Sequence, residues 1–279
     1  MTISVVIPAY NCERYIERCL GSVLSQRGAE LDVIVINDGS SDGTGSVLGQ
    51  YEDRVRILTT ENRGSAAARN SGIEMARGDY VMFIDADDWL ADGAIERLRG
   101  VIDETGADIV KFRYTKIYPD GKEILDAAHQ IDADEVVEKP SFKEKIYPLF
   151  IEGIKLNSMC VGIYKTSLIA GRRLREDMQV AEDAVFSLGT YTAANKVAMI
   201  TDVLYFYYQT GTGLTGSGAA ILKKYHCNFI LAKETSRNLK EWGMNSFGTR
   251  IKVYMRPFLL TFDKVGRLLG GKKKRGDDA

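Results

Sequence analysis

The sequence is poor in the residues that bind soft metals or form disulfide bonds. Its 279 residues include four cysteines, none of them in a CxxC pair, and two histidines. Cys12 and Cys19 fall two turns apart on one expected helix, too far for a disulfide bond, and all four thiols are expected to be reduced, as in a cytosolic protein. A zinc site is therefore disfavoured. Any metal is expected to have oxygen ligands, which favours magnesium or manganese.

The sequence also lacks a hydrophobic run long enough to span a membrane. It shows no signal peptide, because residue 3 already begins an expected strand. The formal net charge is −1, so no general attraction to nucleic acid is expected. We therefore expect a cytoplasmic protein that binds no nucleic acid. Its only candidate contact with the inner face of the cell membrane is its C-terminal part.

The sequence is organised around residues 80–89, which read YVMFIDADDW. The apolar run predicts a buried strand, which delivers the carboxylates of Asp85, Asp87 and Asp88 to one point. Asp85 and Asp87 could together hold a divalent cation and a sugar hydroxyl, whereas Asp88 could simply begin the next helix. Because three acids this close repel one another, the sequence favours a binding site over helix capping alone.

Strand and helix patterns alternate through the first 90 residues. Continuous apolar runs predict strands at 3–7, 31–36, 55–58 and 80–84. Three helices are predicted between them. The first follows Asn11, which can cap it, and has apolar residues at helical spacing from Tyr15 to Leu24. The others are predicted at 43–51 and at 65–77. The predicted fold class is α/β, with a mostly parallel central sheet covered by helices on both faces. Ligands bind beyond the carboxyl ends of such strands. Four segments are expected along that edge: Pro8-Ala9-Tyr10, Asn37-Asp38, Thr59-Thr60-Glu61 and Asp85-Ala86-Asp87.

The pattern is less regular after residue 90. It predicts helices at 93–104, 141–152 and 181–194, strands at 108–118 and 203–208, and a peripheral hairpin or loop at 122–140. From residue 219 to about residue 270 the chain is expected to be mostly helical, with breaks at Gly243, Gly248 and Pro257.

Three further polar positions are candidate site residues. Asp38 could accept a hydrogen bond from a nucleobase imide or a ribose hydroxyl, although Asp-Gly is also an ordinary turn signature. Arg69 lies in the first turns of a helix, where a cation opposes the helix dipole. We expect Asp38, Asp85 or a ligand to compensate it, unless it is a solvated surface residue. Glu182-Asp183 opens a helix, where acids are favoured for capping alone.

Residues 211–218 contain a formal GxGxxG, with glycines at 211, 213 and 216. A dinucleotide-binding motif needs a second parallel strand that ends in an acid about twenty residues later. A long helix is expected here instead, so a flexible lid or a loop beside the substrate is favoured.

Residues 249–275 combine apolar and basic residues at helical spacing. Such a helix can lie on an anionic bilayer. The alternative is a helix packed on its own domain or in a homodimer.

Five motifs, in this order, resemble the family 2 glycosyltransferases of the GT-A fold. They are VVIPAYN at 5–11, NDGSSDGT at 37–44, NRG at 62–64, ARNSG at 68–72 and FIDADD at 83–88. The resemblance is strong over residues 3–90 and patchier to about residue 215. It implies inverting transfer of a sugar from a nucleotide-sugar, usually a UDP-sugar, in bacterial polysaccharide or glycolipid synthesis. We expect a GT-A domain at 1–218, with a nucleotide-binding half at 1–90 and an acceptor half at 91–218. We expect it to be followed by a C-terminal helical extension with a basic tail at 219–279.

The resemblance also implies residue roles. Asp38 and Arg69 would contact the uracil, Asp85 would meet the ribose or the donor sugar, and Asp87 would ligate a manganese or magnesium ion between the two phosphates. Asp183 matches the general base of the family. The implied donor-binding residues are Pro8, Ala9, Tyr10, Asp38, Arg69, Asp85, Ala86 and Asp87.

Two places depart from the family pattern. The chain reads CVGIY at 160–164, where relatives often have WNKLY, and Gln209 stands near the position where relatives often carry an arginine or histidine that helps hold the diphosphate. We expect a metal-dependent enzyme acting on a hydroxyl of a saccharide or lipid-linked acceptor. A donor-binding subunit with little activity of its own stays open as an alternative. So does a nucleotidyltransferase, although no triphosphate loop rich in glycine and basic residues follows the first strand.

Overall fold

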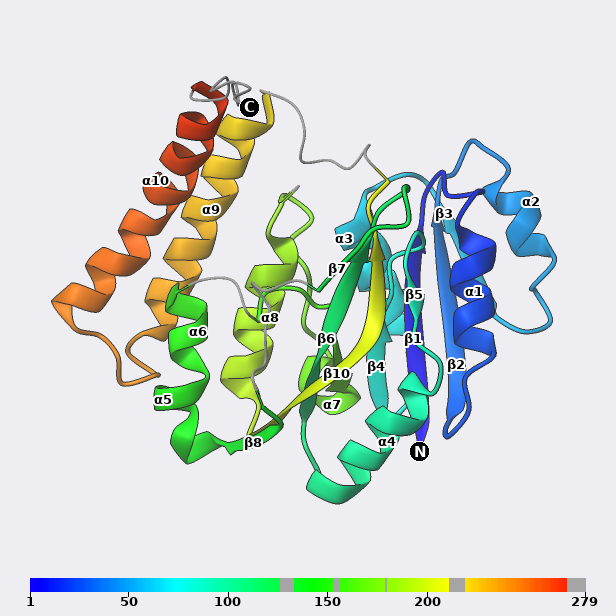
Figure 1. Cartoon of the computed structure of the whole chain (residues 1–279), viewed down its shortest axis with the longest axis horizontal. Helices are drawn as coiled ribbons and strands as arrows, with labels where there is room; N and C mark the ends of the chain where they lie inside the picture. The colour runs from blue at the N-terminus through cyan, green and yellow to red at the C-terminus, as the bar shows by residue number, and fades with distance from the viewer. Residues whose placement is uncertain (126–132, 153–155, 179, 211–218, 270–279) are drawn as a thin grey trace, which may run out of the picture.

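A single mixed sheet of ten strands forms the centre of the part of the chain that the computed structural model describes (Figure 1). Its main path has the strand order β3-β2-β1-β4-β9-β6-β10-β5. The described residues are 1–125, 133–152, 156–178, 180–210 and 219–269, without the side chains of residues 219–224 and 259–269.

The first four strands form the parallel half of this sheet. They are β1 (Thr2–Ala9), β2 (Glu30–Asp38), β3 (Arg56–Thr60) and β4 (Tyr80–Phe83). Each neighbouring pair among them is parallel. The prediction of buried parallel strands is confirmed for β1 and β4, whose apolar side chains are almost completely buried. It is wrong for β3, which lies at the edge of the sheet and has no buried residue.

Three helices connect these strands: α1 (Ile16–Leu24), α2 (Thr44–Gly49) and α3 (Ser65–Met75). Helix α3 packs on β1 and β2, and it can approach closely because a Cβ atom at Gly72 would clash with Val6. The prediction that Asn11 caps α1 is wrong. The side chain of Asn11 instead accepts a hydrogen bond from the backbone N–H of Ser41 at 2.8 Å, so it joins two loops.

The second half of the sheet contains a strand reversal. Strand β9 (Gly162–Lys165) lies antiparallel between β4 and β6 (Ile109–Ile117). Strand β10 (Lys196–Tyr208) is parallel to β6, and β5 (Trp89–Leu90) pairs antiparallel with β10. The sequence pattern does not predict β9, and it predicts only residues 203–208 of β10. Strand β9 is too short to show a period, and irregular register between Met199 and Tyr205 interrupts β10.

The predicted peripheral segment at 122–140 contributes two short edge strands where it is described. Strand β7 (Glu123–Leu125) pairs with β6, and β8 (Glu135–Glu138) pairs with β10. A short 3-10 helix, η2 (Lys139–Ser141), follows β8.

The predicted helix at 141–152 is divided into α5 (Phe142–Lys145) and α6 (Tyr147–Glu152). Pro148 lies in the first turn of α6, where proline is tolerated, but it disfavours a helical conformation in the residues before it. The predictions of α4 (Ala94–Thr105) and α8 (Glu182–Ala193) are confirmed. A one-turn helix, α7 (Thr166–Ile169), follows β9.

The C-terminal part consists of α9 (Ala219–Asn238) and α10 (Phe247–Leu269). Of the three predicted breaks, only Gly243 lies between these helices, and α10 runs through Gly248 and Pro257. We attribute this to packing on α9, where Phe258 meets Tyr225 at 5.5 Å between ring centroids, because such contacts offset the hydrogen bond lost at proline. No helix in the described ranges is both long and apolar enough to cross a bilayer.

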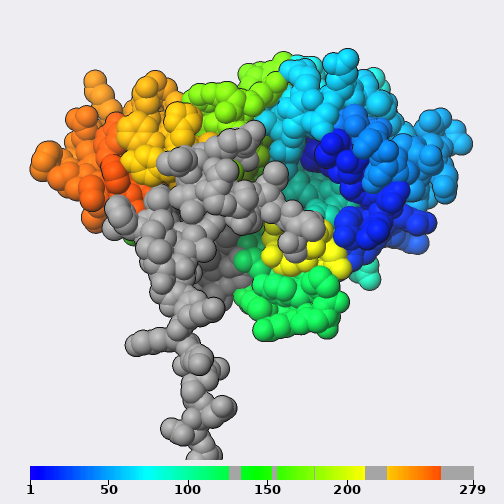
Figure 2. Space-filling model, turned by 90° about the horizontal axis from the view of Figure 1, so that it is seen from above, coloured from blue at the N-terminus to red at the C-terminus, as the bar shows by residue number. Residues whose placement is uncertain are grey.

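Figure 2 views the molecule from above, toward the carboxyl ends of the parallel strands. The N-terminal segments, in blue and cyan, lie on the right, and α9 and α10, in yellow to orange, lie on the left. The N-terminal segments that contain the parallel strands and the C-terminal helices therefore both border this face of the molecule.

Candidate active site

The predicted donor-binding residues at the ends of β1, β2 and β4 lie along the carboxyl edge of the parallel strands. The pairing register puts Ala9 beside Asn37, and Asn37 and Asp38 beside Thr59 and Thr60. Of the predicted donor-binding residues on this edge, Ala9 and Ala86 are buried, Pro8 is half-buried and Tyr10 is 51% exposed.

Asp38 holds the loop that leads into α3. Its carboxylate accepts hydrogen bonds from the backbone N–H groups of Arg63 at 2.9 Å and Gly64 at 2.8 Å. Both oxygens of this buried side chain are therefore used for loop structure. The ion pairs of Arg69 are with Asp85 and Glu182, so Asp38 is not the partner that the helix-dipole argument required.

Arg69 is the central charge of the site. Its side chain is 8% exposed, and Nη2 lies 2.5 Å from Asp85 Oδ1 while Nη1 lies 3.5 Å from Glu182 Oε1. Burial acts to lower the pKa of Arg69, but the charges of Asp85 and Glu182 act to raise it, and the net shift is upward. Of the compensating groups expected from the sequence, Asp85 is confirmed. Glu182 was not anticipated, and the interpretation of Arg69 as a solvated surface residue is wrong.

The third nitrogen of the Arg69 guanidinium takes part in neither of these ion pairs. This Nε atom is buried and has no hydrogen-bond partner among the described residues. A buried donor of this kind costs free energy unless a partner satisfies it. An oxygen of a bound ligand would supply that partner.

The acidic residues after β4 differ in environment. Asp85 has a side chain that is 33% exposed, and it pairs with Arg69. Burial raises the pKa of Asp87 to about 6, and the nearby charge of Asp85 adds to the rise. A carboxylate that is hard to ionise in the free protein gains most from a cation placed beside it.

Asp88 is fully buried, and the prediction that it begins a helix is wrong. It accepts hydrogen bonds from the Tyr205 hydroxyl at 2.5 Å and from the Tyr208 backbone N–H at 2.8 Å. Strand β5 follows it directly, and α4 begins only at Ala94. Burial, then the charges of Asp85 and Asp87, raise the pKa of Asp88.

The residues present fit a shared metal ion better than one held by protein alone. No group of three or more His, Cys, Asp or Glu residues in the described ranges is arranged to hold a metal. A divalent cation at Asp87 would therefore need oxygen ligands from a bound molecule. Phosphate oxygens suit magnesium and manganese in this role.

Asp183 lies in the first turn of α8, beside Glu182. Burial raises the pKa of Asp183 to about 7, the charge of Glu182 adds to the rise and Arg69 opposes it. The Arg69 ion pairs to Asp85 and Glu182 thus connect the end of β4 to the start of α8. A carboxylate whose pKa lies near neutral pH is well suited to accept a proton.

Two buried residues near the acids were not recognised from the sequence. The Nζ atom of Lys111 donates a hydrogen bond to the Ser158 carbonyl at 2.9 Å, and burial lowers the pKa of Lys111 to about 7. Cys160 is buried, and this burial raises the pKa of its thiol. The charges of Asp85 and Asp183 also act to raise that pKa. The sequence signal for Lys111 is a lysine inside the apolar run of β6. The sequence signal for Cys160 is the departure from the family pattern at 160–164.

The remaining sequence features lie elsewhere. The glycines of the formal GxGxxG, at 211, 213 and 216, and the basic tail at 272–275 fall outside the described residues. The backbone N–H of Gln209 donates to the Ile117 carbonyl at 2.8 Å, which continues the strand pairing.

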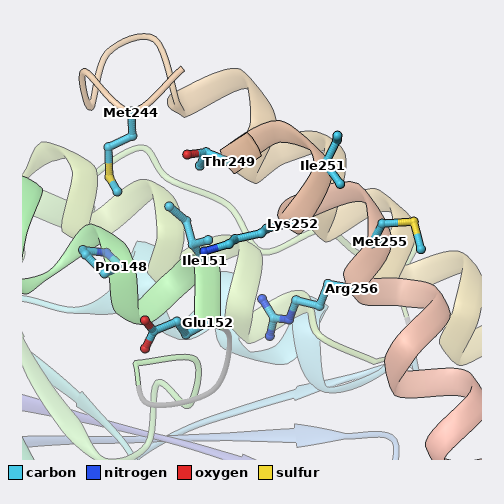
Figure 3. Close-up of a pocket in the computed structure, with 9 residues that line it drawn as sticks. All are labelled: Pro148, Ile151, Glu152, Met244, Thr249, Ile251, Lys252, Met255 and Arg256. Atoms are coloured by element: carbon cyan, nitrogen blue, oxygen red, sulfur yellow. The ribbon is translucent and has the colours of Figure 1, made fainter. Parts of the chain in front are cut away.

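A groove of about 580 Å³ lies between α6 and α10 (Figure 3). It shares no lining residue with the acidic cluster, so it is separate from the candidate active site. Its lining residues are Pro148, Ile151, Glu152, Met244, Thr249, Ile251, Lys252, Met255 and Arg256.

Comparisons with known proteins agree with the geometry. The family model described as "Glycosyl transferase family 2" matches residues 4–168. The glycosyltransferase EpsJ of Bacillus subtilis is 31% identical over 218 residues, which cover 76% of this chain and 62% of EpsJ. The chain thus spans less than two thirds of the length of that relative.

Two solved structures share the fold. TarS of Staphylococcus aureus, in complex with UDP, has a TM-score of 0.70 at 22% identity. The match covers 98% of this chain and 76% of the TarS chain. A mannosyltransferase from Pyrobaculum calidifontis, in complex with GDP-Man and Mn²⁺, has a TM-score of 0.59 at 15% identity, with the same coverage of the two chains. At these identities the likeness concerns the fold alone, and it confirms the predicted architecture.

Proposed function

Because the chain belongs to glycosyltransferase family 2, we propose that it transfers a sugar from a nucleotide-sugar to a hydroxyl of a saccharide or lipid-linked acceptor. We place this reaction in the cytoplasm, in the synthesis of a bacterial polysaccharide or glycolipid. The observation that carries the proposal is the double ion pairing of Arg69. It connects Asp85, at the proposed donor edge, with the helix that presents Asp183.

A UDP-sugar is the proposed donor. The TarS structures that share the fold hold UDP and UDP-GlcNAc. In this chain the exposed ring of Tyr10 offers an apolar surface to a base, next to the proposed pocket residues Pro8, Ala9 and Asp38. The unsatisfied Nε of Arg69 offers a donor to a uracil carbonyl or a ribose oxygen.

Asp87 is the proposed residue for Mn²⁺ or Mg²⁺, with Asp85 and Ala86 on the side of the ribose and donor sugar. When bound, such an ion neutralises the charge that develops on the leaving diphosphate. The raised pKa of Asp87 and the surrounding acids support a cation at this position.

Asp183 is the proposed general base. Its carboxylate accepts the proton of the acceptor hydroxyl as that oxygen attacks the anomeric carbon from the side opposite the diphosphate. A single displacement inverts the configuration and needs only one base, so no second carboxylate is required as a nucleophile. Arg69 limits the rise in the pKa of Asp183 and so keeps it ionisable near neutral pH.

We propose a domain at 1–218, with a donor half at 1–90 and an acceptor half at 91–218, followed by the extension at 219–279. Trp242 supports a tight attachment of this extension. Its ring stacks on Tyr147 with 4.5 Å between centroids, and its Nε1 atom donates to the Thr192 hydroxyl at 3.1 Å. The extension then acts as a fixed part of the enzyme.

We propose that α10 lies on the anionic inner surface of the cell membrane. Phe247, Ile251, Met255 and Phe258 are 81%, 46%, 47% and 39% exposed. Figure 3 shows Ile251 and Met255 directed away from α6, whereas Lys252 reaches toward it. An apolar stripe of this kind, together with basic residues, suits the interface of a bilayer.

Charge favours a bilayer over a second copy of the chain. Residues 247–275 contain nine Lys or Arg residues and one acidic residue, Asp263. Two such segments packed together would repel one another, whereas anionic lipids attract each basic residue near the surface by about 1 kcal/mol.

Vesicle sedimentation tests this surface. We expect the protein to pellet with phosphatidylglycerol-containing vesicles and not with phosphatidylcholine alone, and Ile251→Ser/Met255→Ser to weaken the binding. The double variant Val136→Ser/Leu125→Ser is a matched control, because those side chains are 47% and 40% exposed on β8 and β7. Vesicle binding that the α10 variant does not change, or loss of a dimer in that variant without any vesicle binding, would contradict the proposal.

A thermal-shift screen tests the donor class. UDP-sugars and GDP-sugars are added with and without Mn²⁺, and the preferred donor should raise the melting temperature because it binds the folded state. We expect a UDP-sugar with Mn²⁺ to give the largest shift. A shift with nucleoside triphosphates only would favour a nucleotidyltransferase. Donor binding without transfer to any acceptor, in the purified chain, would favour a donor-binding subunit.

A further inference from the structure

The turn at residues 85–88 is fastened to β10 by a buried phenol. The Tyr205 hydroxyl donates a hydrogen bond to Asp88 Oδ2 at 2.5 Å and accepts one from the Asp85 backbone N–H at 3.2 Å. The Tyr208 backbone N–H donates to Asp88 Oδ1 at 2.8 Å. One carboxylate therefore joins two positions of β10, and one phenol joins both ends of the turn.

Helix α1 holds the same turn from another element. Arg18 Nη2 donates to the Asp87 carbonyl at 2.8 Å. Its guanidinium lies 3.7 Å from the ring centroid of Trp89 and 4.6 Å from that of Tyr208. The planar guanidinium can stack on aromatic rings and donate a hydrogen bond at the same time, which a lysine cannot reproduce. The backbone of Asp85 and Asp87 is thus fixed by partners on α1 and β10.

The chemistry of Asp88 explains why an acid stands there. Its two partners are both donors, the hydroxyl of Tyr205 and the N–H of Tyr208, and they reach different oxygens. An asparagine would offer one acceptor oxygen and present an NH₂ group to the second donor. A buried carboxylate is costly unless it is hydrogen-bonded, so these two bonds are needed to keep it in place.

We infer that Asp88, Tyr205 and Arg18 form a brace that positions Asp85 and Asp87 to bind the donor and its metal ion. These are positioning residues, and the carboxylates that they support are left free of the brace itself. The inference rests on the proposed function, because it takes Asp87 as the metal-binding residue. Outer partners that orient a metal-binding residue typically change metal affinity ~10- to 100-fold when they are removed.

A pair of tyrosine variants separates positioning from a general loss of stability. Tyr205→Phe removes one buried hydroxyl from the brace. Tyr80→Phe removes a comparable one, because the Tyr80 hydroxyl donates to the Ala107 carbonyl at 2.8 Å, at the opposite end of β4. Binding of UDP is measured by titration calorimetry at increasing Mn²⁺, and the melting temperature of each variant is recorded.

We expect both variants to lower the melting temperature, but only Tyr205→Phe to weaken Mn²⁺-dependent UDP binding, by ~10- to 100-fold. Arg18→Gln provides a second route if Tyr205→Phe does not fold, because Arg18 lies on the surface of α1. It should weaken the same binding and leave metal-free UDP binding unchanged.

The outcomes distinguish the inference from the function on which it rests. If wild-type binding depends on Mn²⁺ but Tyr205→Phe and Arg18→Gln bind like Tyr80→Phe, the brace inference is overturned and the metal assignment stands. If the wild-type protein binds UDP equally well without Mn²⁺, the metal role of Asp87 is overturned and the inference fails with it.

Discussion

Replacing Asp183 with asparagine should change activity and stability in opposite directions. Asparagine cannot accept the proton, so transfer should fall by at least ~100-fold while UDP binding is retained. The folded-state pKa of Asp183, about 7, lies about three units above the ordinary value of 3.8. At about 1.4 kcal/mol per pKa unit, ionisation of this half-buried group costs the folded wild-type protein up to about 4 kcal/mol.

The sign of this effect follows from the raised pKa. In the wild type, the folded state holds a proton that the unfolded state loses above pH 3.8. The stabilising contribution of that proton is lost as pH rises from about 4 to 7. Asp183→Asn should therefore unfold with a larger free energy than the wild type at pH 8, and the difference should shrink toward pH 4. Wild-type transfer should rise with pH up to about pH 7, because only the ionised carboxylate accepts a proton.

Two assays check this prediction: urea unfolding from pH 4 to pH 8, and transfer rates with a UDP-sugar over the range in which the protein is folded. Asp177→Asn is the control. Asp177 lies close in sequence, but its hydrogen bonds with Arg175 lower its pKa, so the variant should gain no stability at pH 8 and should keep transfer. Normal turnover in Asp183→Asn, or a stability difference that does not vary with pH, would refute the reasoning.

Three other substitutions test separate parts of the site and its support. Asp87→Ala should abolish Mn²⁺-dependent UDP binding in calorimetry, and an unchanged affinity would remove Asp87 from the metal site. Arg69→Met leaves two carboxylates without their cation and should lower the free energy of unfolding by roughly 3 kcal/mol in urea; a cost near zero would mean that the pairs are not maintained in solution. Gly72→Ala should cost about 1–3 kcal/mol because its Cβ would clash with Val6 on the neighbouring strand, and full stability in this variant would contradict the close approach of α3.

Local sequence patterns were sufficient for the donor edge. Strands β1, β2 and β4 contain apolar runs, and β3 follows the same alternation of strands and helices. The shared direction of the four strands places the polar residues at their ends on one edge. Strand β9 could not be found in this way, because its four residues show no period and its place between β4 and β6 depends on long-range pairing.

Partners distant in sequence explain the site residues that were misjudged. The residues near Asp88 predict a helix start, because nothing in them reveals its partner Tyr205, which lies 117 positions later. The Glu182-Asp183 pair is weak evidence for a site, because acids are common in the first turn of a helix. Only the fold brings Glu182 to Arg69, which lies 113 positions earlier. In contrast, the unfavourable position of Arg69 on its helix did predict a compensating acid, and Asp85 is that acid.

The placement of Arg69 makes the charge of Asp85 and the proton affinity of Asp183 parts of one equilibrium. Arg69 lowers the pKa of Asp183, whereas Asp85, which pairs with Arg69, raises it. A ligand that neutralises Asp85 therefore makes Asp183 easier to ionise. Linkage requires the reverse to hold as well, so ionisation of Asp183 must strengthen the binding of that ligand by the same free energy. The protein would then bind a cation beside Asp85 with release of a proton, and its affinity for that cation would rise with pH through the neutral range.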